Sequence, residues 1–275
     1  MVGSTHLNGM LMLGHVTAIE HIQATTSGKT HPSIIVGERP DHSTVELVAK
    51  FSAGCEEKER GLAREAIAAC LASDLGLPVP APFLVDLPPG WADAVSDPSQ
   101  RARVQNSSTV AFGSHLMTEG YSIWHPGNVI DSAMLPVAAA VFVFDLIIQN
   151  IDRRADNPNC LIKGSEICIF DHELAFMHGV VIGWRPPWVL GGLRDFEQPG
   201  KHIFREGLSK KKIDYEPIRA AWANLPDARI AQYEAELPVE WAVAAPAVQK
   251  ALTLVRDARD NIAGCLKEVK RVLTS

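Results

Sequence analysis

The spacing of hydrophobic and polar positions predicts strands with one helix in the first half of the chain. Short runs of apolar and β-branched residues at 33–36, 44–51 and 81–87 are separated by Gly and Pro and predict strands. Residues 56–75 instead repeat apolar positions every three or four residues, which predicts a helix. Residues 88–107 are rich in Pro, Ser and Asp and predict a loop.

The second half of the chain predicts mostly helices. Residues 136–149 are apolar on nearly every face, which indicates a buried helix that either Asp131 or Ser132 caps. Residues 214–275 predict helix throughout, with one long amphipathic helix over 248–269. A strand-rich part followed by a helical part favours an α+β fold.

Composition limits the classes of protein that fit. With 47% hydrophobic and 21% charged residues, the 275-residue chain is expected to fold, as two small domains or one two-lobed enzyme. A net charge of −6 disfavours bulk binding to nucleic acid or acidic membrane. The lysine-rich stretch 201–212 is interpreted as a solvated basic face. The longest apolar run, 133–144, is too short to span a bilayer.

Cysteine usage and the N-terminus indicate a cellular compartment. The five cysteines are scattered, odd in number and form no CxxC pair, so neither disulfides nor a zinc site are expected. The N-terminus has no charged start followed by a long apolar core, so no signal peptide is expected. We therefore expect a soluble, cytoplasmic protein.

Polar oxygen donors flank a predicted hairpin formed by two apolar runs, 160–162 and 167–170. Asp152 and Asn157 precede the hairpin, five residues apart, and Asp171 follows it. Mg²⁺ takes hard oxygen ligands, one or two from protein and the rest from phosphates and water. Because a hairpin can bring its two ends together, we expect Asn157 and Asp171 to bind metal. Asp152 would then orient an attacking hydroxyl or accept its proton.

The sequence around this hairpin resembles the catalytic core of HipA-like kinases and, more distantly, that of phosphatidylinositol kinases. The family pattern runs Asn-x-Asp-Arg-x-x-x-Asn-Pro-Asn, a hairpin, then Asp-His-x-x-Ala-Phe. It is matched at 150–153, 157–159 and 171–176. Ile151 and His172 depart from ordinary protein kinases, which have Arg before the catalytic Asp and Phe-Gly after the metal-binding Asp. This disfavours control by a phosphorylated activation loop and removes no metal ligand.

The resemblance implies further residues upstream. Lys50, at the end of a strand, would hold the α- and β-phosphates of ATP, and Glu65 on the next helix would pair with Lys50. Gly28 would belong to the loop that covers the nucleotide. Met117, in the segment 112–117 between lobes, would lie where adenine binds.

The resemblance also implies a two-lobed protein-kinase-like fold. Residues 1–113 would form a β-rich, nucleotide-binding N-terminal lobe, and residues 114–275 a mostly helical catalytic lobe. The implied activity is ATP- and Mg²⁺-dependent transfer of the γ-phosphoryl group to a hydroxyl, with serine or threonine on a protein as the first candidate acceptor. A small-molecule or lipid acceptor stays open.

Two functions other than an active kinase are also compatible with parts of the sequence. A catalytically weak, nucleotide-binding pseudokinase that acts through a partner is favoured by the single glycine in the covering loop. The complete set of metal ligands disfavours it. A metal-dependent phosphohydrolase would use the Asp and His residues, but it gives Lys50 no role.

The polar neighbours of these residues have structural interpretations. Asp145, on the buried helix, is expected to bond to the backbone near Asp152, because a buried carboxylate needs partners. His172 is expected to support its loop. Arg153 and Arg154 either meet phosphate or form ion pairs with nearby carboxylates.

Overall fold

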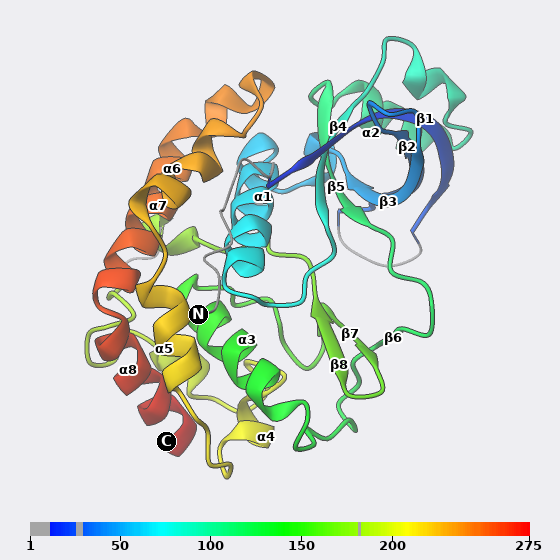
Figure 1. Cartoon of the computed structure of the whole chain (residues 1–275). Helices are drawn as coiled ribbons and strands as arrows, with labels where there is room; N and C mark the ends of the chain where they lie inside the picture. Colours follow the sequence, from blue (N-terminus) through cyan, green and yellow to red (C-terminus); the bar gives the residue numbers. More distant parts are fainter. Residues whose placement is uncertain (1–11, 26–29, 181–182) are drawn as a thin grey trace, which may run out of the picture.

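The computed structural model describes residues 12–25, 30–180 and 183–275, and shows a mixed α/β protein. The N-terminal part is rich in strands and the C-terminal part is helical, as the sequence predicted (Figure 1). None of the helices in these described ranges is long and apolar enough to cross a membrane.

Five strands of the N-terminal part close into a barrel in the order β1-β2-β3-β5-β4. They are β1 (Gly14–Ala24), β2 (Ser33–Glu38), β3 (Thr44–Lys50), β4 (Pro82–Asp86) and β5 (Val110–His115). Neighbouring strands are antiparallel except β1 and β4, which pair in parallel. Alternate residues of each strand point inward, and Val16, Ile35, Leu47 and Val85 form a small core inside the barrel.

The loop predicted over 88–107 is wrong, because this segment contains a short 3-10 helix, η2 (Trp91–Ala94), and helix α2 (Pro98–Gln105). Asp97 caps α2, since its Oδ1 accepts a hydrogen bond of 2.7 Å from the backbone N–H of Gln100. Pro98 occupies the first helical turn, where its missing N–H costs nothing. The Asp and Pro that suggested a loop are therefore the start signal of a helix.

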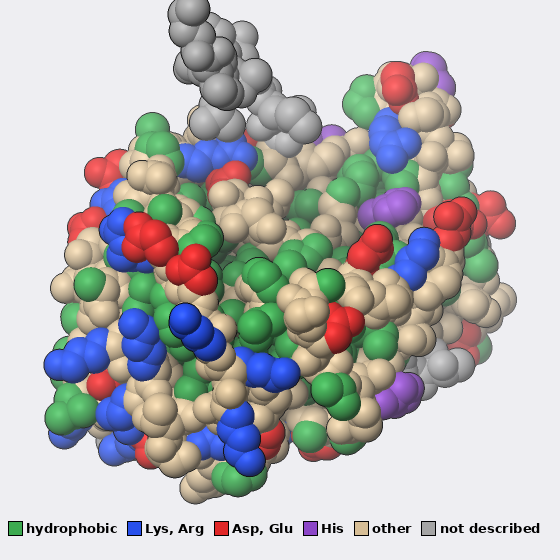
Figure 2. All heavy atoms as spheres, turned by 60° about the horizontal axis from the view of Figure 1, so that its bottom comes forward, with side chains coloured by type: hydrophobic (Ala, Val, Ile, Leu, Met, Phe, Trp, Pro, Cys, Tyr) green, Lys and Arg blue, Asp and Glu red, His purple; other side chains and the backbone are tan. Residues whose placement is uncertain are grey.

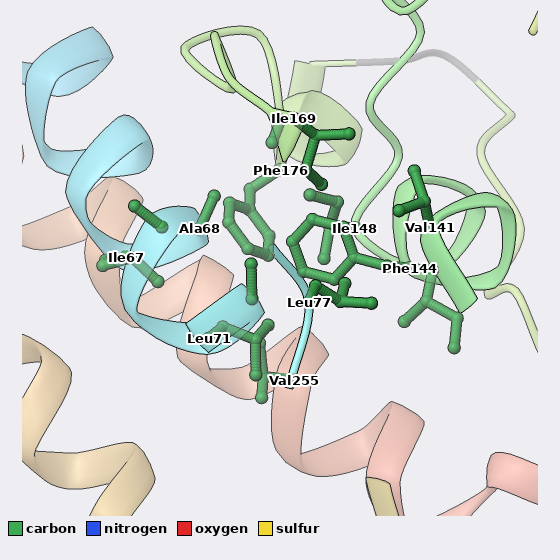
Figure 3. Close-up of a cluster of buried hydrophobic side chains, with 14 of the residues drawn as sticks. Ile67, Ala68, Leu71, Leu77, Val141, Phe144, Ile148, Ile169, Phe176 and Val255 are labelled. Atoms are coloured by element: carbon green, nitrogen blue, oxygen red, sulfur yellow. The ribbon is translucent and has the colours of Figure 1, made fainter. Parts of the chain in front are cut away.

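Helix α1 (Glu59–Asp74) confirms the predicted helix, but it packs away from the barrel core. Residues 61–72 are all buried. The helix shares the larger core of the molecule with α3 (Leu135–Ile147), α6 (Asp227–Ala235) and α7 (Ala245–Asp260). Figure 3 shows Leu71 of α1, Phe144 of α3 and Val255 of α7 in this core, with Phe176 between α1 and α3. The larger core therefore includes residues from both sides of position 113.

Polar contacts from the C-terminal helices also hold the end of α1 and the barrel. Arg229 donates from Nε and Nη2 to the two carboxylate oxygens of Asp74, at 2.7 and 2.9 Å. Tyr233 Oη donates to the same carboxylate at 2.8 Å. Trp241 Nε1 donates to the carbonyl oxygen of Val110 in β5, at 3.0 Å. We call Arg229, Tyr233 and Trp241 the C-terminal clamp.

The tail is helical as predicted, with breaks between its helices. It comprises α5 (Glu216–Ala223), α6, the 3-10 helix η5 (Val239–Ala244), α7 and α8 (Ile262–Thr274). The single helix predicted over 248–269 is interrupted at Asn261, whose side-chain Nδ2 donates to the carbonyl oxygen of Asp257 at 2.8 Å. Asparagine competes for backbone hydrogen bonds in this way and favours helix ends.

Helix α3 and the predicted hairpin lie next to one another in the helical part. The hairpin is confirmed as β7 (Cys160–Lys163) and β8 (Glu166–Ile169), and β6 (Ser122–Ile123) joins its edge. Of the two candidates for the turn before α3, Asp131 accepts a hydrogen bond of 2.8 Å from the backbone N–H of Met134. Short helices complete this part: η1 (Ser52–Gly54), η3 (Met177–Val180), η4 (Arg194–Phe196) and α4 (Arg205–Leu208).

Candidate active site

The two ends of the β7–β8 hairpin lie side by side, as the sequence predicted. Cys160 pairs with Ile169 in the ladder, and the backbone N–H of Phe170 donates to the carbonyl oxygen of Asn159 at 3.2 Å. The loop that carries Asp152 and the segment that carries Asp171 are therefore neighbours, although the hairpin separates them along the chain.

Asp152 and Asn157 contact each other within the loop between α3 and β7. Asn157 Nδ2 donates to Asp152 Oδ2 at 2.7 Å, and Asn159 Nδ2 lies 3.5 Å from the same oxygen. Arg154 Nη2 lies 3.6 Å from Asp152 Oδ1, and Arg154 also pairs with Asp156. Because Asn157 uses its amide nitrogen toward Asp152, its amide oxygen is the group it can offer to a ligand.

Lys50, at the end of β3, is surrounded by three carboxylates. Its Nζ lies 2.6 Å from Asp171 Oδ1, 2.9 Å from Glu65 Oε2 and 3.5 Å from Glu173 Oε2. We call these four residues the carboxylate cluster. Lys50 and Glu65 are buried, so water screens their attraction very little. One ammonium faces three carboxylates, and this excess of negative charge favours a cation beside Asp171.

The charges in this cluster shift one another's pKa values. Burial opposes the charged form of Lys50, but Asp171, Glu65 and Glu173 outweigh it and raise its pKa well above the usual value. Burial likewise opposes ionisation of Glu65, yet the Lys50 ammonium and His172 hold its pKa well below the usual range. Burial raises the pKa of Glu173 to about 7, because Asp171 and Glu65 add to it and Lys50 only partly offsets it.

Arg153 is fully buried and ties the two ends of the hairpin together. Its Nε donates to Asp145 Oδ2 at 2.6 Å. Its Nη1 donates to the carbonyl oxygens of Phe170, at 3.1 Å, and Asn159. Its Nη2 donates to His172 Nε2 at 3.0 Å. Arg153 is thus committed to structure and does not reach a phosphate, which decides between the two interpretations of this residue.

His172 connects Arg153 to the carboxylate cluster, in agreement with its expected supporting role. The backbone N–H of His172 donates to Glu65 Oε2 at 2.7 Å. Since Arg153 has only donors, His172 Nε2 must accept, and the ring proton then sits on Nδ1, 3.5 Å from Glu65 Oε1. The carboxylate of Glu65 therefore receives positive or donor groups from both β3 and the segment after β8.

Asp145 is held by side chains, so the prediction that it bonds to backbone near Asp152 is wrong. Besides Arg153, Asn150 Nδ2 donates to Asp145 Oδ1 at 2.8 Å, and His202 Nε2 donates to Oδ2 at 3.0 Å. Burial opposes ionisation of this carboxyl, but the Arg153 guanidinium and His202 hold its pKa well below the usual range. A carboxylate that is buried away from water needs hydrogen-bond donors and an opposite charge, and a guanidinium provides both.

The predicted site residues fall into distinct places. Lys50, Glu65 and Asp171 meet in one cluster, while Asp152 and Asn157 pair across the loop before β7. Met117 is half-buried, two residues beyond β5. Gly28 lies outside the described residues.

Two polar residues of the site were not predicted. Glu173 could have been suspected, because it lies two residues after Asp171 inside the matched motif. His202 gave no signal, since 57 positions separate it from Asp145 along the chain.

The donor set fits a magnesium ion rather than a softer metal. Across 12–25, 30–180 and 183–275, no group of three or more His, Cys, Asp or Glu side chains is arranged to hold a metal ion. The amide oxygen of Asn157 and the carboxylate of Asp171 are both hard oxygen donors. Mg²⁺ is usually bound by only one or two protein ligands, with phosphates and water completing the shell.

Comparisons with known proteins give the family and the fold. A search of curated proteins gave no match. Among solved structures, the chain is similar to the crystal structure of a Helicobacter pylori proinflammatory kinase, CtkA, with a TM-score of 0.51 and 13% sequence identity. The match covers 94% of this chain and 98% of that chain, and at this identity it indicates a shared fold. The family model for HipA-like kinases matches residues 19–269. The protein therefore belongs to the HipA-like kinase family.

Proposed function

We propose that this protein transfers the γ-phosphoryl group of ATP to a hydroxyl in a Mg²⁺-dependent reaction. The observation that carries the proposal is the meeting of Lys50 with Glu65 and Asp171, within 2.9 Å, next to the loop in which Asp152 holds Asn157. A lysine fixed by a glutamate, a carboxylate on each side of a hairpin and an oriented amide are what phosphoryl transfer requires.

The proposal divides the chain into two lobes at about residue 113, within β5. The barrel lobe would bind the nucleotide, with Gly28 in the covering loop and Met117 beside the adenine. The helical lobe, residues 114–275, would supply Asp152, Asn157 and Asp171. Glu65 would keep Lys50 extended toward the α- and β-phosphate oxygens.

Asn157 and Asp171 would hold Mg²⁺, which when bound neutralises the charge of the phosphate oxygens. Asp171 contacts Lys50 through Oδ1, and within the described residues its Oδ2 has no hydrogen-bond partner. Asn157 already donates its amide nitrogen to Asp152, which leaves its oxygen for the metal. Each side of the hairpin thus offers one oxygen atom that could bind the metal ion.

In the proposed reaction, the acceptor hydroxyl oxygen forms a bond to the γ-phosphorus of ATP. The bond from this phosphorus to the β–γ bridging oxygen breaks, and ADP leaves with the electron pair. The hydroxyl proton passes to the carboxylate of Asp152. Serine or threonine on a protein is the acceptor we propose.

One observation favours the alternative of a weakly catalytic, nucleotide-binding pseudokinase. Lys50 is engaged by three carboxylates, and Glu173 is one more than the proposed mechanism uses. Phosphate oxygens must compete with these carboxylates for the ammonium. Tight ATP binding with no measurable transfer would support this alternative.

The test compares Asp152→Asn and Asp171→Asn by ATP titration with and without Mg²⁺ and by transfer of labelled γ-phosphate. Asp171→Asn should weaken Mg²⁺-dependent ATP binding and transfer together. Asp152→Asn should chiefly slow transfer, since its contact with the acceptor matters most in the transition state. Asp156→Asn is the matched control, because Asp156 lies in the same loop with a side chain that is 75% exposed.

Two results would contradict the assignment. Transfer by Asp152→Asn at the wild-type rate would remove Asp152 from catalysis. Full Mg²⁺-dependent affinity and activity in Asp171→Asn would mean that the hairpin does not carry the metal site.

A further inference from the structure

A pocket of about 440 Å³ lies beside the loop that carries Asp152. Its lining includes Trp124, Val129, Ala155, His202, Glu206 and Lys211. Ala155 is three residues beyond Asp152. The backbone N–H of Ala155 donates to the carbonyl oxygen of Gly200 at 3.4 Å, which joins the loop to the segment just before the lining residue His202. A ligand in this pocket therefore lies against the same loop that positions the proposed catalytic carboxylate.

The apolar part of the pocket is suited to a hydrophobic side chain. Trp124 is buried and packs edge-on against Phe204, with ring centroids 5.1 Å apart, so this wall is fixed. Val129, on the opposite end of the same short segment, is 78% exposed. An exposed aliphatic side chain beside a fixed aromatic wall gains free energy when an apolar group covers it.

Lysine side chains occur in the lining of the pocket and next to lining residues in the sequence. Lys211 lines it, and the exposed Lys201 and Lys210 neighbour lining residues in the sequence. None of these three lysines has an acidic partner within the described residues. The pocket's own acidic residue, Glu206, already accepts from the backbone N–H of Gly200 at 3.2 Å and lies 3.5 Å from Arg205. Figure 2, turned so that the end of the molecule with α4 comes forward, shows Lys and Arg side chains over this end, with hydrophobic side chains between them.

We infer that this pocket, with its lysines, binds the acceptor polypeptide: one apolar residue enters the pocket and acidic residues beside it face Lys201, Lys210 and Lys211. The inference rests on the proposed function and adds the sequence class of the acceptor. The lysines extend beyond the pocket, so the ligand must be longer than one side chain. The apolar lining distinguishes a polypeptide from a polyanion that lacks hydrophobic groups.

The interaction should appear as sequence preference in transfer from labelled ATP to a positional peptide library with a central serine. At one position or more, leucine should be preferred over alanine, and glutamate should be preferred over lysine at neighbouring positions. The double variant Lys210→Glu/Lys211→Glu should lower transfer to the glutamate peptides about tenfold and raise transfer to the lysine peptides. Increased transfer to the lysine peptides by this double variant cannot result from unfolding, because unfolding would lower transfer to every peptide.

Two further variants separate the apolar and the charged parts of the pocket. Val129→Asp should remove the leucine preference and leave ATP affinity, measured by titration, unchanged. Lys267→Glu makes the same charge change at an exposed lysine of α8 that does not line the pocket, and it should keep the wild-type preferences.

The outcomes distinguish this inference from the proposed function. If wild type phosphorylates the peptides but Lys210→Glu/Lys211→Glu and Lys267→Glu show the same preferences, the inference is wrong and the kinase activity stands. Equal competition by a single-stranded RNA oligonucleotide and by an acidic peptide would also overturn it. If wild type binds ATP but labels neither the peptides nor any protein of a cell lysate, the proposed function itself fails.

Discussion

Replacing Arg153 with methionine should destabilise the fold more than any other single change in the loop before β7. Methionine has a similar length, so it fills most of the space without the charge. The change leaves the Asp145 carboxylate fully buried, with only Asn150 and His202 as partners. It also removes the donor to the carbonyl oxygens of Asn159 and Phe170 at the two ends of the hairpin.

The size of the effect follows from these contacts. Breaking a buried ion pair by removing one partner costs about 3–5 kcal/mol, because the remaining charge has no compensation. Each carbonyl that loses its donor adds about 1 kcal/mol when water cannot replace it. A total of about 5 kcal/mol is a large share of the usual free energy of unfolding. For 275 residues it corresponds to a fall in melting temperature of about 9 °C, at about 2.1 cal/mol/K of unfolding entropy per residue.

Thermal unfolding of a double-mutant cycle tests whether the buried charge causes this loss. Asp145→Asn, Arg153→Met and the double variant are compared with wild type. The double variant should be more stable than Arg153→Met by about 2 kcal/mol, since it no longer buries an unpaired carboxylate. Arg154→Met is the control, because this neighbouring side chain is 34% exposed and its ion pairs should contribute less than about 1 kcal/mol.

Additive free energies in this cycle would refute the reasoning. So would a loss for Arg153→Met no larger than that for Arg154→Met. In either case the structure would not depend on compensation of the Asp145 charge.

Three further changes test other parts of the structure. Lys50→Met should weaken Mg-ATP binding about tenfold, or 1.4 kcal/mol, without unfolding the chain; titration calorimetry measures it, and unchanged affinity would remove Lys50 from the nucleotide site. Asp74→Asn should cost about 1–2 kcal/mol in urea unfolding, because it weakens a charged bond to Arg229; an unchanged midpoint would mean that the Arg229 and Tyr233 contacts of the C-terminal clamp add no stability. Burial lowers the pKa of His202, so the folded protein keeps this ring neutral while the unfolded chain protonates it below about pH 6.5. Wild type should therefore lose stability as pH falls through this range, and His202→Gln should lessen the slope of the urea midpoint against pH; identical slopes would exclude His202 as a source.

The parts of the site that the sequence predicted are those fixed by local spacing. Asp152 and Asn157 belong to one loop, and the alternation of the two apolar runs specifies the hairpin that brings Asp171 beside them. Lys50 and Glu65 follow from a strand end and the next helix, once the resemblance supplies the pairing. Each of these inferences needs only the spacing of residues that are close in the sequence, or a family motif.

The buried support of the site could not be predicted in the same way. Asp145 takes His202 as a partner from a distant segment, and nothing in the sequence around either residue indicates the other. The surroundings of α1 were equally hidden, because its burial depends on α6 and α7 at the other end of the chain. Tertiary packing determines both the Asp145–His202 contact and the burial of α1, and the local spacing of apolar residues does not reveal this packing.

The C-terminal clamp has a consequence for the order of events during synthesis. The ribosome releases the chain from its N-terminus, so the barrel and α1 emerge well before α6 and α7. Until Arg229 and Val255 have emerged, α1 lacks the ion pair at its C-terminal end and partners for part of its apolar surface. A growing chain should therefore complete the packing of α1, the helix that carries Glu65, only near the end of translation. Release of a chain cut short before α6 would leave an inactive fragment with an exposed apolar helix, the kind of surface that chaperones and proteases bind.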